Sequence, residues 1–346
     1  MSKIRRNFGL LYREVIKPGY CAVCGACAGV CPVNAIEIDH HLPKLVSQCV
    51  NCGACIDVCL RINQRIALTK TSYKNILGEY IRVLKAESTD KEIQETSQNG
   101  GVVTSILLAA YNNNLIDAAI LTDLGHSIFS PRIIIAENQE VIKKAARSKY
   151  ALNPLLTEIS AVKYSSKKKF AVVGLPCHLE ALDNIIKEGY YNTNKKVKYK
   201  IGLFCMRSYF AELLELIVTH ETGLSPENII RTEIRSGKLI LESLDGMQEL
   251  PLKALKDARV PGCRYCKDLT NRHADIAIGN IGVEDNKNIV IIRTKKGEKL
   301  IDLAIEKGYL KVIETDAEMM KQIIDTITNV GEKKLKYSRD MPELEV

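Results

Sequence analysis

Twelve cysteines provide most of the chemistry available to this 346-residue chain, and eight of them lie in two runs near the N-terminus. Each run has the spacing C-x2-C-x2-C-x3-C. Three closely spaced thiolates can hold three corners of one [4Fe-4S] cluster, while the fourth cysteine of the run reaches the other cluster. The repeat therefore predicts two clusters. Their predicted ligands are Cys21, Cys24, Cys27 and Cys59 for one, and Cys49, Cys52, Cys55 and Cys31 for the other.

Small residues inside each run suit the crowded surroundings of a cluster. Gly25 and Gly53 follow the second cysteine of their runs, where a tight loop brings backbone N–H groups toward the sulfur atoms and favours a positive φ. The first run ends in Cys31-Pro32, whereas Leu60 takes the place of proline in the second run. This change affects the local loop and not the ligands. A zinc site would use four cysteines in two pairs, which is a different pattern.

The remaining four cysteines lie far apart in the sequence. Cys177 and Cys205 each follow a predicted buried strand, at the carboxyl edge where α/β folds place their sites. The pair Cys263 and Cys266 is spaced to add two ligands from one loop. Together they predict a third [4Fe-4S] cluster. The alternatives are a zinc site, or inert buried thiols at the first two positions. We interpret His178 as a surface residue or as one that supports a ligand.

A glycine-rich turn offers a second kind of chemistry. Gln98, Asn99, Gly100 and Gly101 open a predicted helix whose first turns carry Thr104. Two glycines at the start of a helix let the backbone approach an anion closely, and the free N–H groups and the helix dipole favour a phosphate. The same residues are also a common turn and helix cap. On this motif alone, phosphate binding and a purely structural turn both stay open.

A basic segment further along could serve the same ligand. Arg147, Ser148, Lys149 and Tyr150 combine two cations with hydroxyl groups, which would suit a pyrophosphate. The alternative is the basic C-terminal end of a helix, where cations bind the last carbonyl groups. The segment alone does not decide between these two roles.

Composition and charge narrow the class of protein. Hydrophobic residues make up 46% of the chain and charged residues 26%, which is typical of a folded domain. The net charge of +8 would fall to roughly +2 with three clusters, since each oxidised cluster with four thiolates carries about −2. We therefore expect bound anionic cofactors and no nucleic acid, for which a basic stripe with aromatic residues is missing. With no long apolar segment and no secretory signal, we expect a cytoplasmic protein without a transmembrane helix.

Hydrophobic patterns predict two domains. Residues 1–72 should form a ferredoxin-like domain with short strands at Ala35–Asp39 and Pro43–Val46. A polar linker at Thr69–Lys74 leads into a larger domain at residues 73–346. In that domain strands alternate with helices, which predicts an α/β or α+β fold with a mixed sheet.

The elements of the larger domain follow from apolar periodicity. The predicted strands are Ile81–Lys85, Ala118–Leu121, Ile133–Ala136, Phe170–Val173, Tyr199–Phe204, Ile229–Ile234, Lys238–Leu241, Ile276–Ile278 and Ile289–Arg293. The predicted helices are Gly101–Asn113, Glu140–Arg147, His178–Lys187, Phe210–Thr222 and Thr315–Asn329. Gly331 follows the last of these helices, and we interpret it as a stop signal.

Several short segments of the larger domain occur together in one known family. They are Gly100–Thr104, Arg147–Tyr150, Gly174–Cys177, Gly202–Cys205, Cys263–Cys266, Ala274–Gly282 and Val290–Thr294. In this order they resemble the family of coenzyme F420 hydrogenase/dehydrogenase beta subunits, over roughly residues 75 to 300. The cysteine-rich segment ahead of them resembles that of the archaeal electron-input subunit whose complex oxidises reduced F420.

The resemblance implies an FAD-binding domain, an iron-sulfur cluster within it, and coenzyme F420 as the substrate that exchanges a hydride with the flavin. It favours an FAD-binding role for Gln98–Gly101, Thr104 and Arg147–Tyr150. It also implies that single electrons pass through three [4Fe-4S] clusters to a redox partner protein or to a membrane complex, with the chain bound peripherally on the cytoplasmic face. Two alternatives remain. The chain could serve a soluble hydrogenase, formate dehydrogenase or heterodisulfide reductase complex, or it could be a non-catalytic electron-relay subunit.

Overall fold

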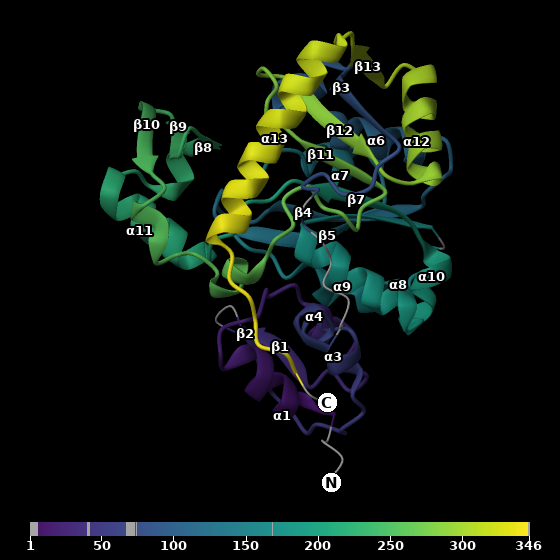
Figure 1. The fold of residues 1–346 in the computed structure, drawn as a ribbon, viewed down its shortest axis with the longest axis vertical. Coiled ribbons are helices and arrows are strands. Elements are labelled where there is room, and N and C mark those ends of the chain that lie inside the picture. Colours follow the sequence, from purple (N-terminus) through teal and green to yellow (C-terminus); the bar gives the residue numbers. More distant parts are fainter. Residues whose placement is uncertain (1–5, 40–41, 67–72, 74, 168, 345–346) are drawn as a thin grey trace.

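The computed structural model describes residues 6–39, 42–66, 73, 75–167 and 169–344. A small cysteine-rich unit, purple in Figure 1, lies at one end of a large α/β unit. The predicted linker Thr69–Lys74 falls outside the described residues, apart from Tyr73. Within the described ranges, no helix combines the length and the apolarity needed to cross a membrane.

The N-terminal unit is built from two similar halves. Its elements are α1 (Phe8–Leu11), the π-helix η1 (Tyr12–Ile16), α2 (Ala26–Gly29), β1 (Ile36–Asp39), β2 (Leu42–Leu45), α3 (Ala54–Asp57) and α4 (Leu60–Ile66). The strands β1 and β2 pair antiparallel, which confirms the predicted strand pair. The helices α2 and α3 each start after a left-handed glycine, Gly25 with φ 87° and Gly53 with φ 83°. The positive φ expected for both glycines is therefore confirmed.

An eight-stranded mixed sheet forms the centre of the larger unit, in the order β13-β3-β12-β11-β7-β6-β4-β5. Its strands are β3 (Arg82–Ser88), β4 (Ala118–Leu124), β5 (Pro131–Ala136), β6 (Phe170–Gly174), β7 (Val197–Leu203), β11 (Ile276–Gly279), β12 (Asn288–Ile292) and β13 (Leu310–Ile313). The strands β4, β6, β7 and β11 are parallel, and β3 shares their direction because both β3 and β11 are antiparallel to β12. Their carboxyl ends therefore meet at one edge, where α/β folds place their ligands.

Helices cover both faces of this sheet (Figure 1). They are α5 (Lys91–Thr96), α6 (Val102–Asn112), α7 (Gln139–Lys144), η2 (Leu155–Ser160), α8 (Ala161–Tyr164), α9 (Pro176–Lys187), η3 (Tyr190–Asn192), α10 (Thr193–Lys196), α12 (Lys295–Glu306) and α13 (Ala317–Tyr337). Alternate residues of β4 enter two cores. Ala119 and Leu121 pack with residues of α6, α7 and α12, whereas Ala118 and Ile120 pack with residues of η2, α9 and α13.

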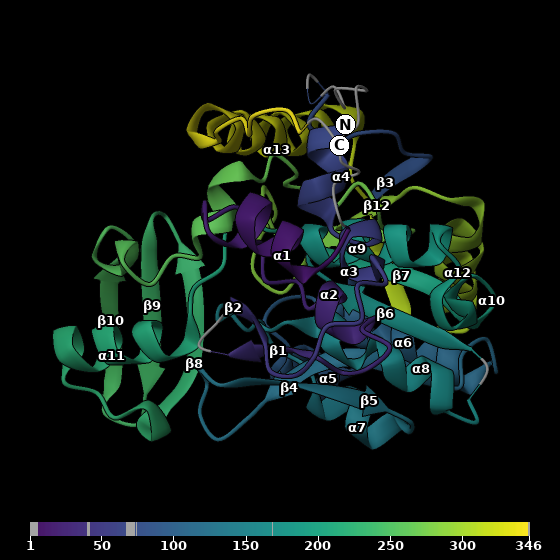
Figure 2. The same ribbon diagram turned by 90° about the horizontal axis from the view of Figure 1, so that it is seen from below.

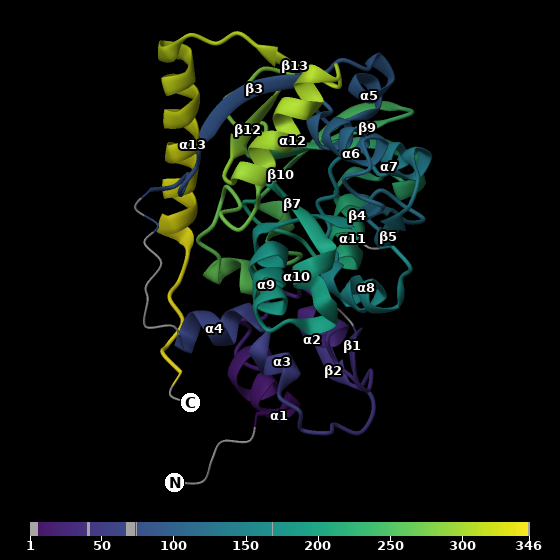
Figure 3. The same ribbon diagram turned by 90° about the vertical axis from the view of Figure 1, so that its right-hand side faces the viewer.

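The N-terminal unit shares the second of these cores. Ala22, Ala26 and Val30 are buried in the same hydrophobic cluster as residues of η2. The approach is close, because a Cβ built on Gly29 would lie 1.9 Å from the carbonyl oxygen of Leu156. The C-terminal tail returns to the same unit (Figure 3), where Arg65 Nε donates to the carbonyl of Pro342 at 2.7 Å. The described parts of the two units thus pack as one body.

A three-stranded sheet stands beside the main sheet (Figure 2). It consists of β8 (Ile229–Arg235), β9 (Lys238–Ser243) and β10 (Gly246–Pro251), and it packs with α11 (Ala211–Thr222) around its own core. The 3-10 helices η4 (Pro226–Asn228), η5 (Ala254–Lys256) and η6 (Pro261–Tyr265) connect it to its neighbours. The sequence predicted β8 and β9 but not β10, whose residues are mostly exposed and lack a clear apolar alternation.

The predicted end of the last helix is wrong. We expected Gly331 to stop it, but α13 continues to Tyr337. The reason is packing, since a Cβ at Gly331 would lie 2.2 Å from Cγ2 of Ile76. Glycine is needed there for close contact between α13 and the segment before β3, and not for a change of backbone direction. The sequence also missed α12 and β13.

Candidate metal centres and cofactor site

The first group of thiols lies largely inside the N-terminal unit, where Cys27 is buried and Cys21, Cys24 and Cys59 are half-buried. Burial and, to a smaller extent, the charge of Cys59 raise the pKa of Cys21 to about 12 and that of Cys24 to about 12. The pKa of Cys27 is raised by burial and by the same three neighbours. Four mutually repelling thiols in a buried place suit ligands of a cationic iron core, which would hold them deprotonated.

The second group lies closer to the surface. Burial raises the pKa of Cys55 to about 12, followed by the charges of Cys49, Cys52, Cys59 and Cys31. Cys52 is exposed, whereas Cys55 is buried. The two groups are adjacent, since Cys55 also raises the pKa of Cys27 in the first group.

The backbone around the two groups repeats in detail. Val23 and Asn51 occupy equivalent positions and both are left-handed, with φ values of 53° and 57°. Each donates its N–H to the sulfur two residues before it, at 3.4 Å to Cys21 Sγ and 3.5 Å to Cys49 Sγ. Such N–H to sulfur bonds support thiolate ligands of iron-sulfur clusters. The donor set therefore fits the predicted pair of clusters.

The fold brings the four remaining cysteines together. Cys177 lies in the first turn of α9, Cys205 follows β7, and Cys263 and Cys266 belong to η6 and its end. The pKa of Cys177 is raised well above its usual value by burial and by the charges of the other three. Cys24 of the first group acts on it as well. The three groups thus form a continuous series.

A single metal ion requires several ligand side chains gathered around one point. In the described part of the chain, no group of three or more His, Cys, Asp or Glu side chains is placed to hold a single metal ion. The thiols of each group do act on one another's pKa, as neighbouring ligands of one cluster would.

The sequence did not predict that His178 is buried. It is 2% exposed, so the surface interpretation is wrong. His178 lies in the first turn of α9, and its side chain is directed into the protein. Its Nδ1 accepts a hydrogen bond from the N–H of Leu175 at 3.2 Å. Burial lowers the pKa of His178 to about 4, and a hydrogen bond with the backbone of Asn153 offsets part of this effect. His178 is therefore neutral, and its ring connects the start of α9 with the backbone of Asn153.

Asn271 was missed altogether, because no sequence motif contains it. Its Nδ2 donates to the carbonyls of Gly174 at 2.8 Å and Leu203 at 3.3 Å. These carbonyls belong to the last residues of β6 and β7, the strands that precede Cys177 and Cys205. Asn271 therefore fixes the distance between two strand ends that carry thiols of the third group.

The glycine-rich turn also lies at the carboxyl edge, because the carbonyl of Gly100 accepts from the N–H of Ser88 at the end of β3. A Cβ on Gly100 would lie 3.0 Å from Asn288 Oδ1, and one on Gly101 would lie 2.6 Å from Ile93 Cγ2. Gly101 has a φ of 71°. Both glycines therefore allow close packing of the chain on itself, as the structural interpretation predicts.

Polar side chains beside the glycines are better placed for a ligand. Ser97 Oγ and Gln98 Nε2 are buried and have no hydrogen-bond partner among the described residues. Asn99 is half-buried and Thr104 is buried. Buried polar atoms normally have partners. A flavin held at this edge would satisfy the first two, so these residues fit the cofactor that the sequence resemblance implies. Ser97 was not singled out from the sequence.

The basic segment Arg147–Tyr150 connects the glycine-rich turn to the three-stranded sheet. Arg147, left-handed with φ 77°, donates to the carbonyls of Thr96 at 3.1 Å and Ile230 at 3.0 Å. Arg231 of β8 donates to the carbonyl of Gln98 at 2.7 Å. The segments that the sequence singled out are therefore brought together, with β8 as an unpredicted neighbour.

Lys149 and Tyr150 have structural contacts. Lys149 Nζ donates to the carbonyls of Ala145, Ala146 and Arg147 beyond α7, and burial lowers its pKa to about 8. Tyr150 Oη accepts from the N–H of Ile234 at 3.2 Å, with Ser148 as a further hydrogen-bond partner. Lys149 thus caps the end of a helix, which is the alternative that the sequence left open.

Comparison with known proteins places these features in one family. Residues 83–160 match the N-terminal part of the coenzyme F420 hydrogenase/dehydrogenase beta subunit, and residues 167–318 match the C terminus of the same beta subunit. Residues 13–60 match a 4Fe-4S dicluster domain.

Individual relatives agree with this match. The chain is 30% identical to a subunit of the F(420)H(2) dehydrogenase of Methanosarcina mazei, over 84% of each chain. It is also 30% identical to the coenzyme F420 hydrogenase subunit beta of Methanothermobacter thermautotrophicus, over 68% of this chain and 85% of the relative. Its fold is similar to a chain of the F420-reducing [NiFe] hydrogenase complex from Methanosarcina barkeri, with a TM-score of 0.69, 27% identity, and coverage of 76% of this chain and 94% of that one. The chain belongs to the family of coenzyme F420 hydrogenase/dehydrogenase beta subunits, which are oxidoreductases, and carries a 4Fe-4S dicluster domain ahead of the family's own domains.

Proposed function

We propose that this chain oxidises reduced coenzyme F420 and delivers the electrons one at a time to a partner protein. The observation that carries the proposal is the series of three thiol groups, which begins at the carboxyl edge of the sheet and ends at the exposed Cys52. A two-electron hydride carrier at one end and a single-electron acceptor at the other would use such a series. Relatives named for F420-linked dehydrogenase and hydrogenase activity support the choice of substrate.

Three [4Fe-4S] clusters and one FAD are the cofactors that we propose. FAD can accept a hydride and release single electrons, while each cluster carries one electron. The ligand sets would be Cys21, Cys24, Cys27 and Cys59, then Cys49, Cys52, Cys55 and Cys31, and finally Cys177, Cys205, Cys263 and Cys266. The protein would contribute position, charge and exclusion of water.

Residues at the carboxyl edge would orient the flavin. Ser97 and Gln98 would supply the hydroxyl and amide groups, and Arg231 would hold the Gln98 backbone in place through its bond to the carbonyl. Because β8 contacts this turn, the small sheet would cover the site from the side.

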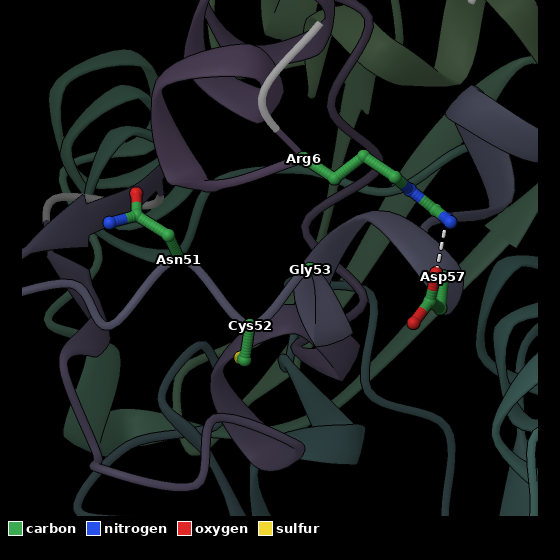
Figure 4. Close-up of a pocket in the computed structure, with 5 residues that line it drawn as sticks. All are labelled: Arg6, Asn51, Cys52, Gly53 and Asp57. Atoms are coloured by element: carbon green, nitrogen blue, oxygen red, sulfur yellow. Dashed lines mark hydrogen bonds and ion pairs between the residues drawn. The ribbon is translucent and has the colours of Figure 1, made fainter. Parts of the chain in front are cut away.

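The surface around Cys52 would bind the electron-accepting partner. A cavity of about 370 Å³ is lined by Arg6, Asn51, Cys52, Gly53 and Asp57. Figure 4 shows these residues, with Arg6 and Asp57 paired at one side. Val33, Leu45 and Val50, all exposed, border the second thiol group. An apolar surface at the cluster nearest to solvent suits close approach of another redox protein.

The proposal is tested with the full chain, reconstituted with iron, sulfide and FAD. Reduced F420 should be oxidised with a viologen as acceptor, seen as the return of the visible absorbance of oxidised F420. A loaded protein that leaves reduced F420 unchanged would contradict the proposed substrate. A chain that retains no flavin would point instead to an electron-relay subunit. Co-purification from the native source would identify the partner and show whether the chain associates with a membrane complex.

A further inference from the structure

Arg61 is a fully buried cation between the first and third thiol groups. It is 1% exposed, although it lies on α4, a short helix close to the surface. Its Nε donates to the carbonyl of Tyr20 at 3.1 Å, next to Cys21. On its other side, Nη2 donates to the carbonyl of Gly262 at 2.7 Å and Nη1 to that of Tyr265 at 3.1 Å. One guanidinium thus joins the loops that carry Cys21, Cys263 and Cys266.

The hydrogen-bond acceptors of Arg61 carry no charge. Among the described residues they are backbone carbonyls and the amide oxygen of Gln64, at 2.8 Å from Nη1. Glu180 is linked to Arg61 through Gln64, whose Nε2 donates to its carboxyl at 2.6 Å, and the two charges interact, but burial outweighs this and raises the pKa of Glu180 overall. A buried cation without an adequate counter-charge is expensive. An anion is therefore expected close to Arg61.

Lys334 repeats this arrangement on the far side of the third thiol group. It is 5% exposed and projects from α13, where its Nζ donates to the carbonyls of Cys205 at 2.5 Å and Asp268 at 2.6 Å. Its ammonium group thus lies against the backbone of Cys205, a proposed ligand, and of Asp268, two residues after Cys266. The negative groups that act on it are the thiolates of the third group and the carboxylate of Asp268.

Other buried cations of this chain are paired differently. Arg65 lies one turn after Arg61 on α4 and forms an ion pair with Glu14 at 3.4 Å. Lys85 of β3 is 4% exposed and pairs with Glu284 at 3.2 Å. Arg61 and Lys334 therefore stand out as buried cations beside cysteines, bonded mainly to neutral oxygens.

We propose that Arg61 and Lys334 are positioning residues that set cluster reduction potentials, Arg61 for the first and third clusters and Lys334 for the third alone. The inference rests on the proposed function, since it requires the clusters. Reduction adds one electron and takes the net charge of a cluster and its four thiolates from about −2 to about −3. A fixed positive charge nearby favours the more negative state and so raises the potential.

The test is a redox titration of the full, reconstituted chain, followed by electron paramagnetic resonance. The third-cluster signal is identified by its loss in Cys205→Ser. Arg61→Gln should lower the potentials of the first and third clusters by at least a tenfold change in the reduction equilibrium, about 59 mV for one electron. Lys334→Met should lower that of the third cluster alone. Arg61→Lys keeps the charge and should keep both potentials close to wild type.

Arg65→Gln and Lys85→Met are the matched controls, and neither should move any cluster potential. Unchanged potentials in Arg61→Gln and Lys334→Met, with iron content equal to wild type, would overturn the inference and leave the proposed function standing. Equal shifts in the controls would overturn it as well. If Arg61→Gln fails to fold, Lys334→Met and Arg61→Lys still decide the outcome. A wild-type chain without a third-cluster signal would instead contradict the proposed function.

Discussion

The thiol groups of this chain are held in place by two different kinds of structure. In the N-terminal unit, short-range backbone geometry arranges the sulfur atoms, and the paired left-handed residues Val23 and Asn51 show that each run follows the same local plan. The third group has no such plan. Cys177 and Cys205 follow different strands of the main sheet, and the pair from Cys263 to Cys266 comes from η6.

This difference separates local from tertiary control. A local loop keeps its ligand geometry as long as its own residues are intact. A site assembled at a sheet edge depends on residues far from the ligands, such as Asn271, which joins the ends of β6 and β7. Substitutions in the larger unit should therefore affect the third group while leaving the first two loaded.

The largest effect is expected from removing a ligand of the third group. Cys205→Ser should reduce the iron content from about twelve to about eight atoms per chain, since a [4Fe-4S] cluster contains four irons. Iron and sulfide analysis measures this directly. Ser208→Ala is the control, because the backbone N–H of Ser208, and not its hydroxyl, donates to Cys263 Sγ. Full iron in Cys205→Ser would show that Cys205 holds no cluster.

The contact between the two units gives the next test. In Gly29→Ala the new methyl group would collide with the carbonyl of Leu156, which is backbone and has little freedom to move. We expect a loss of about 1–3 kcal/mol in the free energy of unfolding, typical of overpacking. Denaturant unfolding measures it. Gly9→Ala, a helical glycine of α1 with its nearest contact at 3.2 Å from a side chain, should be tolerated. Equal losses in both variants would argue against tight docking.

Asn271 tests tertiary control of the third group. Asn271→Gly removes the donor to the carbonyls of Gly174 and Leu203 but keeps a residue suited to its φ of 61°. The unfolding free energy should fall by about 1–3 kcal/mol, and the third cluster should be lost more readily than the others. Asn286→Gly is the matched control, being exposed with the same φ. If both variants lose iron equally, the strand-end contact is not what holds the site.

The smallest effect depends on pH. His273 Nδ1 hydrogen-bonds Asp183 at 2.8 Å, and although burial alone lowers the pKa of His273, this carboxylate raises it overall. The raised pKa means that the protonated form contributes stability fully below about pH 6.5, and that this contribution disappears as the pH rises through the folded value. His273→Gln should therefore cost on the order of 1 kcal/mol at pH 6, after discounting a pair about one-third exposed, and less at pH 9.

Unfolding at both pH values checks this expectation. His220→Gln is the control, because the His220 side chain is 82% exposed and should matter at neither pH. A loss in His273→Gln that does not change with pH would mean that the ion pair contributes nothing.

The sequence predicted those features of the fold that depend on residues close together in the chain. The cysteine repeat, Gly25, Gly53 and most strands of the sheet follow from spacing and periodicity. Gly331 misled the prediction because its role is set by contact with Ile76, a residue far away in the chain.

The same reason explains the other failures. His178 is polar, so the sequence favoured a surface position, but its place in the first turn of α9 directs the side chain into the protein. Arg61 and Lys334 lie in no motif, and only the fold shows that both are buried beside thiols. Long-range packing therefore decides the details that local patterns leave open.

The three-cluster assignment is tested by the content of iron, sulfide and FAD per chain in the purified, reconstituted protein. Three clusters and one flavin predict about twelve iron atoms, about twelve sulfides and one FAD. About eight iron atoms would contradict the central claim, because the four cysteines gathered at the sheet edge would then hold no cluster.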